Sequence, residues 1–231
     1  MRLPLRLFLA LGLLTCCQPN KKTALILPEG KVGLIGYGSL TSSEQMAAQL
    51  GKPYTGGVEI VHLEGFQRTW TATTPNQLQF PPVGLLLRCL YAGDSIAPKK
   101  LSALNIRKND SVAINCCFFI IDEEDLEPID RTEKGYQRIE VTDKIREFNV
   151  SGGRVWAYQA MPEFTETPKT ENPQNYAVAK LYLDFLEAGF SELGDLYREE
   201  FYETTLPIPE QIVLRCAMVS PNDHEDDPND E

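Results

Sequence analysis

LIGYGSL, residues Leu34 to Leu40, places two glycines, a tyrosine and a serine where an apolar run ends. The run Val32–Tyr37 predicts a buried strand, and Ser42–Leu50, ended by Gly51, predicts the helix that follows. A glycine at such a turn lets the backbone approach a ligand closely, and the first amides of a helix present unpaired N–H donors. The stretch therefore predicts a loop that binds an anion or a developing oxyanion.

Outside this stretch, the pattern predicts many strands and few helices. Further strands are expected at Val58–His62, Phe66–Thr73, Val83–Tyr91, Asp110–Ile121, Gln137–Val141, Arg154–Ala160 and Ile212–Val219. Further helices are expected in a short piece capped by Asp122 and limited by Pro128, at Tyr176–Ala188 ended by Gly189, and at Ser191–Tyr202. Strands and helices do not alternate regularly, so the pattern indicates an α+β fold and disfavours a doubly wound nucleotide-binding fold.

Size and charge narrow the class of protein. The 231 residues, 42% hydrophobic and 24% charged, are typical of one soluble globular domain, expected here at 31–220. The net charge of −11 argues against a nucleic-acid partner, because binding to phosphates needs a basic face. Residues 221–231 carry six acids and no Lys or Arg, and they predict a disordered acidic tail.

The N-terminal stretch MRLPLRLFLALGLLTCC, residues 1–17, predicts an export signal over 1–15. Its apolar run is too short to span a membrane. Leu13-Leu14-Thr15-Cys16 resembles the lipobox of bacterial lipoproteins, which implies lipidation of Cys16, with Cys17 as the alternative acceptor. We therefore expect a protein of the bacterial cell envelope, held at the membrane by a lipid anchor and a linker over 16–30. A plain signal or an uncleaved hydrophobic end is the alternative.

Four more cysteines lie in apolar runs: Cys89, Cys116, Cys117 and Cys216. Neighbouring strand residues point to opposite faces, so Cys116 and Cys117 are not expected to pair with each other. We expect buried free thiols, and leave open a bridge from Cys216 to Cys89 or to Cys116. The absence of any C-x-x-C motif gives no support to a structural zinc site.

The residue inventory favours a carboxylate as the proton shuttle of any enzyme reaction. Only His62 and His224 exist, His224 lies in the acidic tail, and His62 is expected to be a packed or edge histidine. No G-x-S-x-G or Walker motif occurs, so a serine hydrolase or a P-loop enzyme is disfavoured. Glu133 stands out within the acidic segment 120–141, because it lies where the chain must turn from a helix into a strand before Gly135 and Tyr136.

The loop and this acidic segment together resemble the γ-glutamylcyclotransferase family. Tyr37-Gly38-Ser39-Leu40 is followed by Ile129-Asp130-x-x-Glu133-x-Gly135-Tyr136-x-Arg138 in the family's order. Leu63–Trp70, Ser111–Asp122 and Arg154–Tyr158 resemble the surrounding strands. The resemblance implies a small mixed β-barrel flanked by helices, with a helical C-terminal extension that we expect to roof the cavity.

The resemblance also implies a reaction and its site. The α-amine of a small γ-glutamyl substrate attacks its own γ-carbonyl carbon, which gives 5-oxoproline and a free amine without a cofactor. Glu133 matches the catalytic glutamate and would carry the proton, and desolvation is expected to make it a better base. The residues that would bind the γ-glutamyl group are Tyr37, Gly38, Ser39 and Leu40, with Tyr136 as a hydrogen-bond partner.

Two arginines are weaker candidates for orienting a substrate carboxylate. Arg138 lies two residues after Tyr136, and an ion pair with Asp130 is an equal alternative for it. Arg68 is the second candidate. A non-catalytic envelope binding module and an amide or isopeptide hydrolase remain the competing functions, and oligomeric state stays open.

Overall fold

The structure is a computed structural model that describes residues 22–76, 86–168 and 173–219. Its strands are β1 (Thr23–Ile26), β2 (Lys31–Gly36), β3 (Glu59–Pro75), β4 (Leu86–Tyr91), β5 (Asp94–Ile96), β6 (Lys100–Asp122), β7 (Tyr136–Glu140), β8 (Phe148–Ser151), β9 (Val155–Ala160), β10 (Tyr176–Ala179) and β11 (Val213–Val219). Its α-helices are α1 (Ser43–Leu50), α2 (Leu126–Thr132), α3 (Lys180–Leu193) and α4 (Asp195–Glu203). Short 3-10 turns are η1 (Glu123–Asp125), η2 (Thr142–Lys144), η3 (Pro162–Phe164) and η4 (Glu210–Ile212). The expected signal, the acidic tail, Cys16 and Cys17 lie outside the described residues.

Most strands form one curled sheet built around the long strand β6. The order is β5-β4-β11-β10-β6-β2-β9-β7, and β3 pairs antiparallel with β6 along most of its length. Within the described residues the path ends at β5 and β7, so the predicted small mixed β-barrel is an open half-barrel. The predicted α+β class is confirmed.

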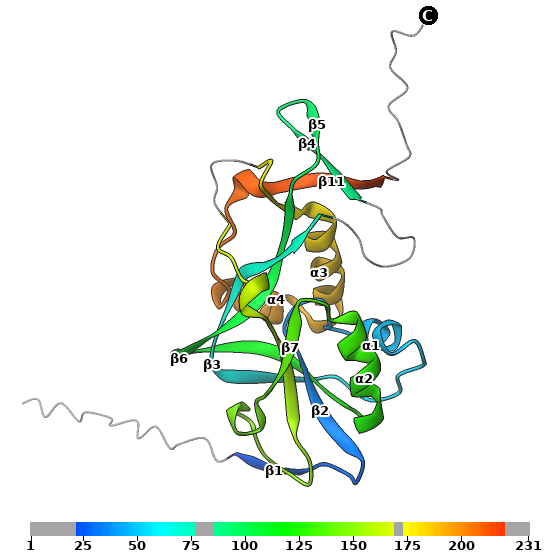
Figure 1. The fold of residues 1–231 in the computed structure, drawn as a ribbon. Helices are drawn as coiled ribbons and strands as arrows, with labels where there is room; N and C mark the ends of the chain where they lie inside the picture. The colour runs from blue at the N-terminus through cyan, green and yellow to red at the C-terminus, as the bar shows by residue number, and fades with distance from the viewer. Residues whose placement is uncertain (1–21, 77–85, 169–172, 220–231) are drawn as a thin grey trace, which may run out of the picture.

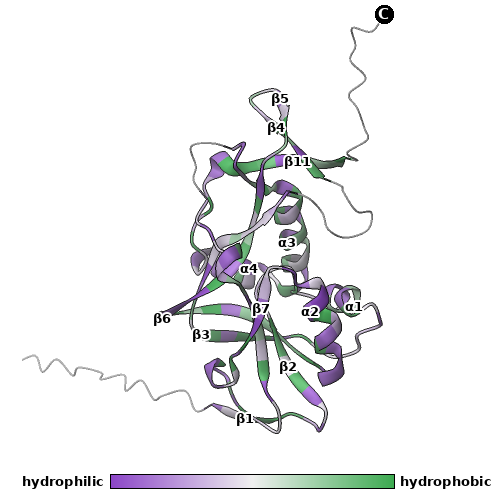
Figure 2. Ribbon diagram, viewed as in Figure 1, coloured by the Kyte–Doolittle hydropathy of each residue, from purple (hydrophilic) through white to green (hydrophobic). Residues whose placement is uncertain are grey.

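Figure 1 shows how the elements surround this sheet. The strands β4, β5 and β11 lie at one end of the molecule and β1 lies at the other, with β6 running between them. The helices α1 and α2 lie next to each other beside β2, while α3 and α4 lie nearer the β11 end. Figure 2 shows hydrophobic bands along β2, β3 and β6 and a mainly hydrophilic α2. The main core is one continuous cluster of side chains from the sheet and the helices, in which Leu34, Phe119 and Ile129 are fully buried.

The helix after the quoted loop begins and ends as predicted. Ser42 caps α1, because its Oγ accepts a hydrogen bond from the backbone N–H of Gln45 at 3.1 Å. The Gln45 side chain reaches back, and its Oε1 accepts from the N–H of Thr41 at 2.6 Å. At the other end, Gly51 ends the helix in the left-handed conformation that glycine tolerates. These contacts fix α1 to the loop that precedes it.

Several predicted boundaries are wrong because pairing across the sheet continues past local breaks. The expected turn at Glu64-Gly65 is a bulge inside β3, which shifts the register against β6 without ending the strand. In the expected linker, Thr23–Ile26 forms β1 and pairs in parallel with β8. Pro128 lies inside the first turn of α2, where a proline removes no necessary hydrogen bond, so it does not limit that helix.

The predicted helix at Tyr176–Ala188 is wrong in its first turn and at its end. Tyr176–Ala179 forms β10, which lies in parallel between β6 and β11 and is buried at every residue. A strand covered on both faces is a continuous apolar run, which periodicity alone does not distinguish from a helix. Gly189 lies within α3, and the break before α4 falls at Gly194.

Two of the four described cysteines form a disulfide, and the other two are free thiols. Cys89 on β4 lies opposite Cys216 on antiparallel β11, and the two form a disulfide. Cys116 and Cys117 are buried free thiols. The expectation of free thiols is therefore confirmed for Cys116 and Cys117 and wrong for Cys89 and Cys216. Directly opposed positions on paired strands bring Cβ atoms close enough for a bridge.

Candidate active site

A cavity of about 220 Å³ opens between the loop after β2, the strand β6, the junction of α2 with β7, and the helix α3. Its lining residues are Ile35, Gly36, Tyr37, Gly38, Ser39, Leu40, Ala103, Leu104, Glu133, Tyr136, Tyr158 and Tyr182. All five residues predicted to bind the γ-glutamyl group, and Glu133, thus lie around one cavity. Glu133 is the sole carboxylate in this lining.

Glu133 owes its place in the cavity to the end of α2. It is the C-cap residue of that helix. Gly135 then takes a positive φ of 87°, which turns the chain into β7. The side chain is half-buried, and burial raises the pKa of its carboxyl from the ordinary 4.5 to about 7. The charged form makes no ion pair with any described cation. A base of this strength is well matched to proton transfer at neutral pH.

The loop 37–40 supplies hydrogen-bond donors to the cavity, whereas Glu133 supplies a proton acceptor. In the parts of the chain that the structure describes, no group accepts a hydrogen bond from the backbone N–H of Gly38, Ser39 or Leu40. The turn is tight because a Cβ on Gly36 would lie 1.9 Å from the carbonyl oxygen of Leu40. Unpaired amides before a helix are suited to an anion or to the oxyanion of a tetrahedral intermediate.

Four tyrosines form most of the remaining wall. Burial raises the pKa of Tyr37 and of Tyr136 well above the ordinary value of 10, so these phenols stay neutral and can donate hydrogen bonds. The Tyr136 hydroxyl donates to the carbonyl oxygen of Leu104 at 2.7 Å, which holds the ring against β6. Tyr158 and Tyr182, which sequence reasoning missed, come from β9 and α3. No local motif marks either, although both lie in segments with predicted regular structure.

The two candidate arginines lie away from this lining. Arg138 Nε forms an ion pair with Asp130 Oδ1 at 2.8 Å, the alternative considered from the sequence, and its guanidinium lies over the Trp156 ring. The Asp130 carboxylate also accepts a hydrogen bond from the Tyr158 hydroxyl at 2.8 Å. Arg138 therefore acts on the site through Asp130 and Tyr158, which is a supporting position.

The expectation that Arg68 orients a substrate carboxylate disagrees with its position. Its side chain is 0% exposed and is absent from the cavity lining. Its guanidinium donates to Phe201 O at 3.2 Å and to Thr205 Oγ1 at 3.0 Å, and it lies 3.9 Å from the centre of the Phe201 ring. Arg68 thereby fastens the end of α4 to β3, because a cation at a helix C-terminus satisfies the last carbonyl groups.

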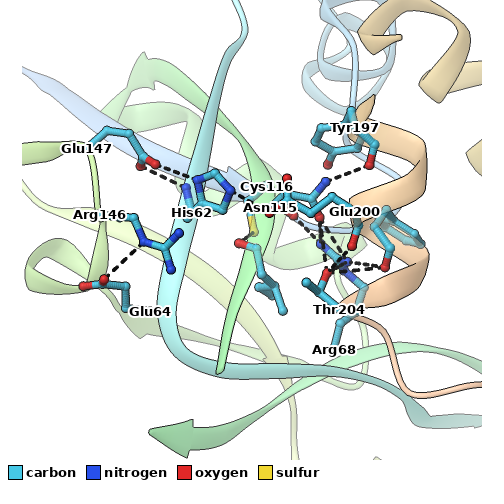
Figure 3. Close-up of polar contacts among 12 residues, drawn as sticks. His62, Glu64, Arg68, Asn115, Cys116, Arg146, Glu147, Tyr197, Glu200 and Thr204 are labelled. Atoms are coloured by element: carbon cyan, nitrogen blue, oxygen red, sulfur yellow. Dashed lines mark hydrogen bonds and ion pairs between the residues drawn. The ribbon is translucent and has the colours of Figure 1, made fainter. Parts of the chain in front are cut away.

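Figure 3 shows the polar contacts that surround this arginine, with His62 further along the same strand. His62 Nδ1 lies 2.6 Å from Glu147 Oε1, and Nε2 lies 2.7 Å from Glu200 Oε1 on α4. The histidine therefore joins three segments and is a structural residue, consistent with the packed or edge position expected for it. Within the described ranges, no group of His, Cys, Asp and Glu residues is arranged to hold a metal ion, and no helix has the length and apolarity to cross a membrane.

The chain resembles known proteins in structure and not in sequence. No family model and no curated protein sequence matches the chain. A solved structure described as a γ-glutamyl cyclotransferase superposes with a TM-score of 0.51 at 13% identity, over 79% of this chain and 95% of that one. The protein has the γ-glutamylcyclotransferase-like fold.

Two other solved structures are similar at lower scores. One is an uncharacterized human protein, with a TM-score of 0.48 and 14% identity over 80% of this chain and 96% of that one. The other is a yeast γ-glutamyl cyclotransferase specific to glutathione, with a TM-score of 0.41 and 12% identity over 76% and 96%. At these identities the likeness concerns the fold, and an activity has to be argued from the cavity.

Proposed function

We propose that the protein is a γ-glutamylcyclotransferase-like enzyme that converts a γ-glutamyl amine, amino acid or peptide into 5-oxoproline and a free amine. The observation that carries this proposal is one cavity holding a lone carboxylate of raised pKa and three unbonded backbone N–H groups. An intramolecular acyl transfer needs these two features, a base for the amine and a donor group for the oxyanion.

Each step of the proposed reaction uses a group in that cavity. The carboxylate of Glu133 takes a proton from the substrate α-ammonium, whose ordinary pKa is about 8, and frees the nitrogen lone pair. The nitrogen then forms a bond to the γ-carbonyl carbon, and the carbonyl oxygen becomes an oxyanion bound by the amides of the loop 37–40. Glu133 next gives this proton to the leaving nitrogen as the original C–N bond breaks, and it accepts the second proton that the ring nitrogen must lose to become the lactam N–H. That second proton passes to the released amine, which leaves as an ammonium ion and restores the carboxylate. The five-membered lactam and the free amine are released.

The decisive experiment is to measure 5-oxoproline and free glutamate released from a panel of γ-glutamyl compounds. Glu133→Gln keeps the size of the side chain and removes the base, so we expect 5-oxoproline release to fall by at least about 10²-fold. Glu127→Gln is the matched control, because that carboxylate is exposed on α2 and pairs with Arg131. It should leave the rate unchanged.

Other outcomes would favour the competing functions. Free glutamate in place of 5-oxoproline would indicate that water is the nucleophile and that the protein is a hydrolase. Equal rates in Glu133→Gln and the wild type would remove Glu133 from the mechanism. Binding of 5-oxoproline without turnover of any compound would indicate a non-catalytic binding module.

We also propose that the chain is exported and anchored through a lipid on Cys16. The predicted signal over 1–15 supports export, and so does the Cys89–Cys216 disulfide, because such bridges persist in oxidising compartments. Labelled palmitate should enter the wild-type protein in a bacterial host and be lost in Cys16→Ser. Labelling that survives in Cys16→Ser and disappears in Cys17→Ser would move the anchor by one residue.

A further inference from the structure

Gln49, in the last turn of α1, is the side chain that reaches the Glu133 carboxylate. Its Nε2 lies 3.3 Å from Glu133 Oε1 and 2.5 Å from Thr132 Oγ1. The Thr132 hydroxyl donates its own proton to the carbonyl oxygen of Ile129 at 2.8 Å, so it accepts from Gln49. Both N–H groups of the amide thus have acceptors, which fixes the direction of the Gln49 side chain.

The hydrogen bonding leaves the two oxygens of Glu133 in different states. Oε1 accepts from Gln49, and within the described residues no side chain donates to Oε2. A carboxylate held at one oxygen cannot rotate freely, so the other oxygen keeps a defined direction. The free oxygen is the one available to take a proton from a substrate.

Gln49 also lines a second hollow, which adjoins the cavity. It lines a groove of about 450 Å³ between α1 and α3, and this groove shares Ser39 and Leu40 with the cavity that contains Glu133. Helix α1 therefore connects the donor loop, at its first turn, with the carboxylate, at its last turn. This placement gives Gln49 a role in the site although it does not line the cavity itself.

We infer that Gln49 is a positioning residue, which holds Oε1 of Glu133 so that Oε2 takes and returns the proton. The inference rests on the proposed function and names a residue outside the motifs of the sequence. A donor to the charged carboxylate favours the ionised form. Removing that donor should therefore make Glu133 a stronger base that is ionised over a narrower pH range.

The test compares Gln49→Leu and Gln49→Glu with the wild type and with Gln137→Leu. Gln137 gives a matched control, because it is exposed on β7 and makes no side-chain hydrogen bond to a described residue. Two quantities are measured: the pH dependence of kcat/KM for 5-oxoproline release, and the titration of the Glu133 carboxyl carbon by ¹³C NMR, assigned by its loss in Glu133→Gln.

We expect the acid limb and the NMR midpoint to rise by about one pH unit in Gln49→Leu. They should rise further in Gln49→Glu, where two carboxyl groups share a site, and stay unchanged in Gln137→Leu. At pH 9 the rate in Gln49→Leu should return to within a few-fold of the wild type, which a loss of folding would not allow.

Two results separate the inference from the proposed function. An unchanged NMR midpoint in both folded Gln49 variants would overturn the role of Gln49, even if the wild type releases 5-oxoproline. A shifted midpoint in a protein that turns over no γ-glutamyl compound would support the hydrogen bond from Gln49 to Glu133. It would also rule out the proposed reaction. If Gln49→Leu fails to fold, the isosteric Gln49→Glu decides between these results.

Discussion

At the scale of single residues, Glu133 combines two demands that oppose each other. A carboxyl group that ionises near pH 7 is a much better base than an exposed glutamate. The same burial makes its charged form unfavourable in the folded protein, because the charge loses water and gains no cation. Function and stability should therefore respond to pH in opposite directions around this residue.

The pH dependence of activity should report this carboxyl group directly. Because the reaction needs the ionised carboxylate and the substrate ammonium, kcat/KM should fall about tenfold for each pH unit below 7 and be highest between pH 7 and about 8, the ordinary pKa of the α-amine. The measurement is the initial rate of 5-oxoproline release at low substrate concentration. An acid limb near pH 4.5, the ordinary value for glutamate, would mean that the working site does not desolvate Glu133.

Glu133→Gln should lose activity but gain stability at high pH. Between pH 4.5 and about 7 the folded wild type binds a proton that the unfolded chain has lost, so its free energy of unfolding falls as pH rises. Glutamine does not titrate, so the variant should be more stable at pH 8 by on the order of 2 kcal/mol, with little difference below pH 4.5. Urea unfolding at both pH values measures this, and equal stability at pH 8 would contradict it.

At the scale of elements, a helix or strand was predicted correctly when its own residues carried the signal, and was missed when its burial depended on distant parts of the chain. The strand before Tyr37 and the helix after Ser42 carry their own signals, an apolar run, a capping serine and a terminal glycine, and both were predicted. The strand β10 carries no such signal, because its burial comes from β6 and β11, which are distant in the sequence. Gly189 resembled a helix end, yet a Cβ there would lie 2.0 Å from Thr41 Oγ1, so its role is close packing of α3.

The same division applies to the candidate site. Glu133, Tyr136 and the loop 37–40 lie in two motifs whose order in the chain identified them. Gln49 and Tyr182 reach the site from faces of helices, and no spacing in the sequence links them to Glu133. Arg68 was misread because a buried arginine and a substrate-binding arginine look alike until their partners are known.

The attachment of α4 should depend on Arg68. Replacing it by alanine removes a guanidinium that holds Phe201 O and the Asn115 side chain, and it opens a space beneath the Phe201 ring. We expect Arg68→Ala to lower the free energy of unfolding by about 3 kcal/mol or more. Arg131→Ala, which removes an exposed i,i+4 pair, should cost less than about 0.5 kcal/mol. A loss below 1 kcal/mol in Arg68→Ala, measured by urea unfolding, would contradict this role.

At the scale of the whole molecule, the disulfide joins chain segments that are 127 residues apart. Glu133 and Tyr136 lie between its two ends in the sequence, whereas the loop 37–40 precedes Cys89. No residue of β4 or β11 lines the cavity, so the bridge should contribute to stability without shaping the site.

Reduction should test this separation of roles. In the chain-entropy account, opening so long a loop should cost about 2–4 kcal/mol of unfolding free energy. The rate of 5-oxoproline release at 25 °C should stay within about twofold, as long as the protein remains folded. Urea unfolding with and without reductant gives the first quantity. The double variant Cys89→Ser, Cys216→Ser is the control, since reductant should no longer change its stability.

Helix α1 also fixes the distance between the donor loop and Glu133. Ser42 begins the helix directly after the donor loop, and Gln49 at the other end contacts the base, so the seven steps between them set the separation of the two halves of the site. Removing one residue from this span would shorten it by about 1.5 Å and turn Gln49 by about 100° around the helix axis. Point changes on its exposed face should therefore be tolerated during evolution, while insertions and deletions within those seven steps should not.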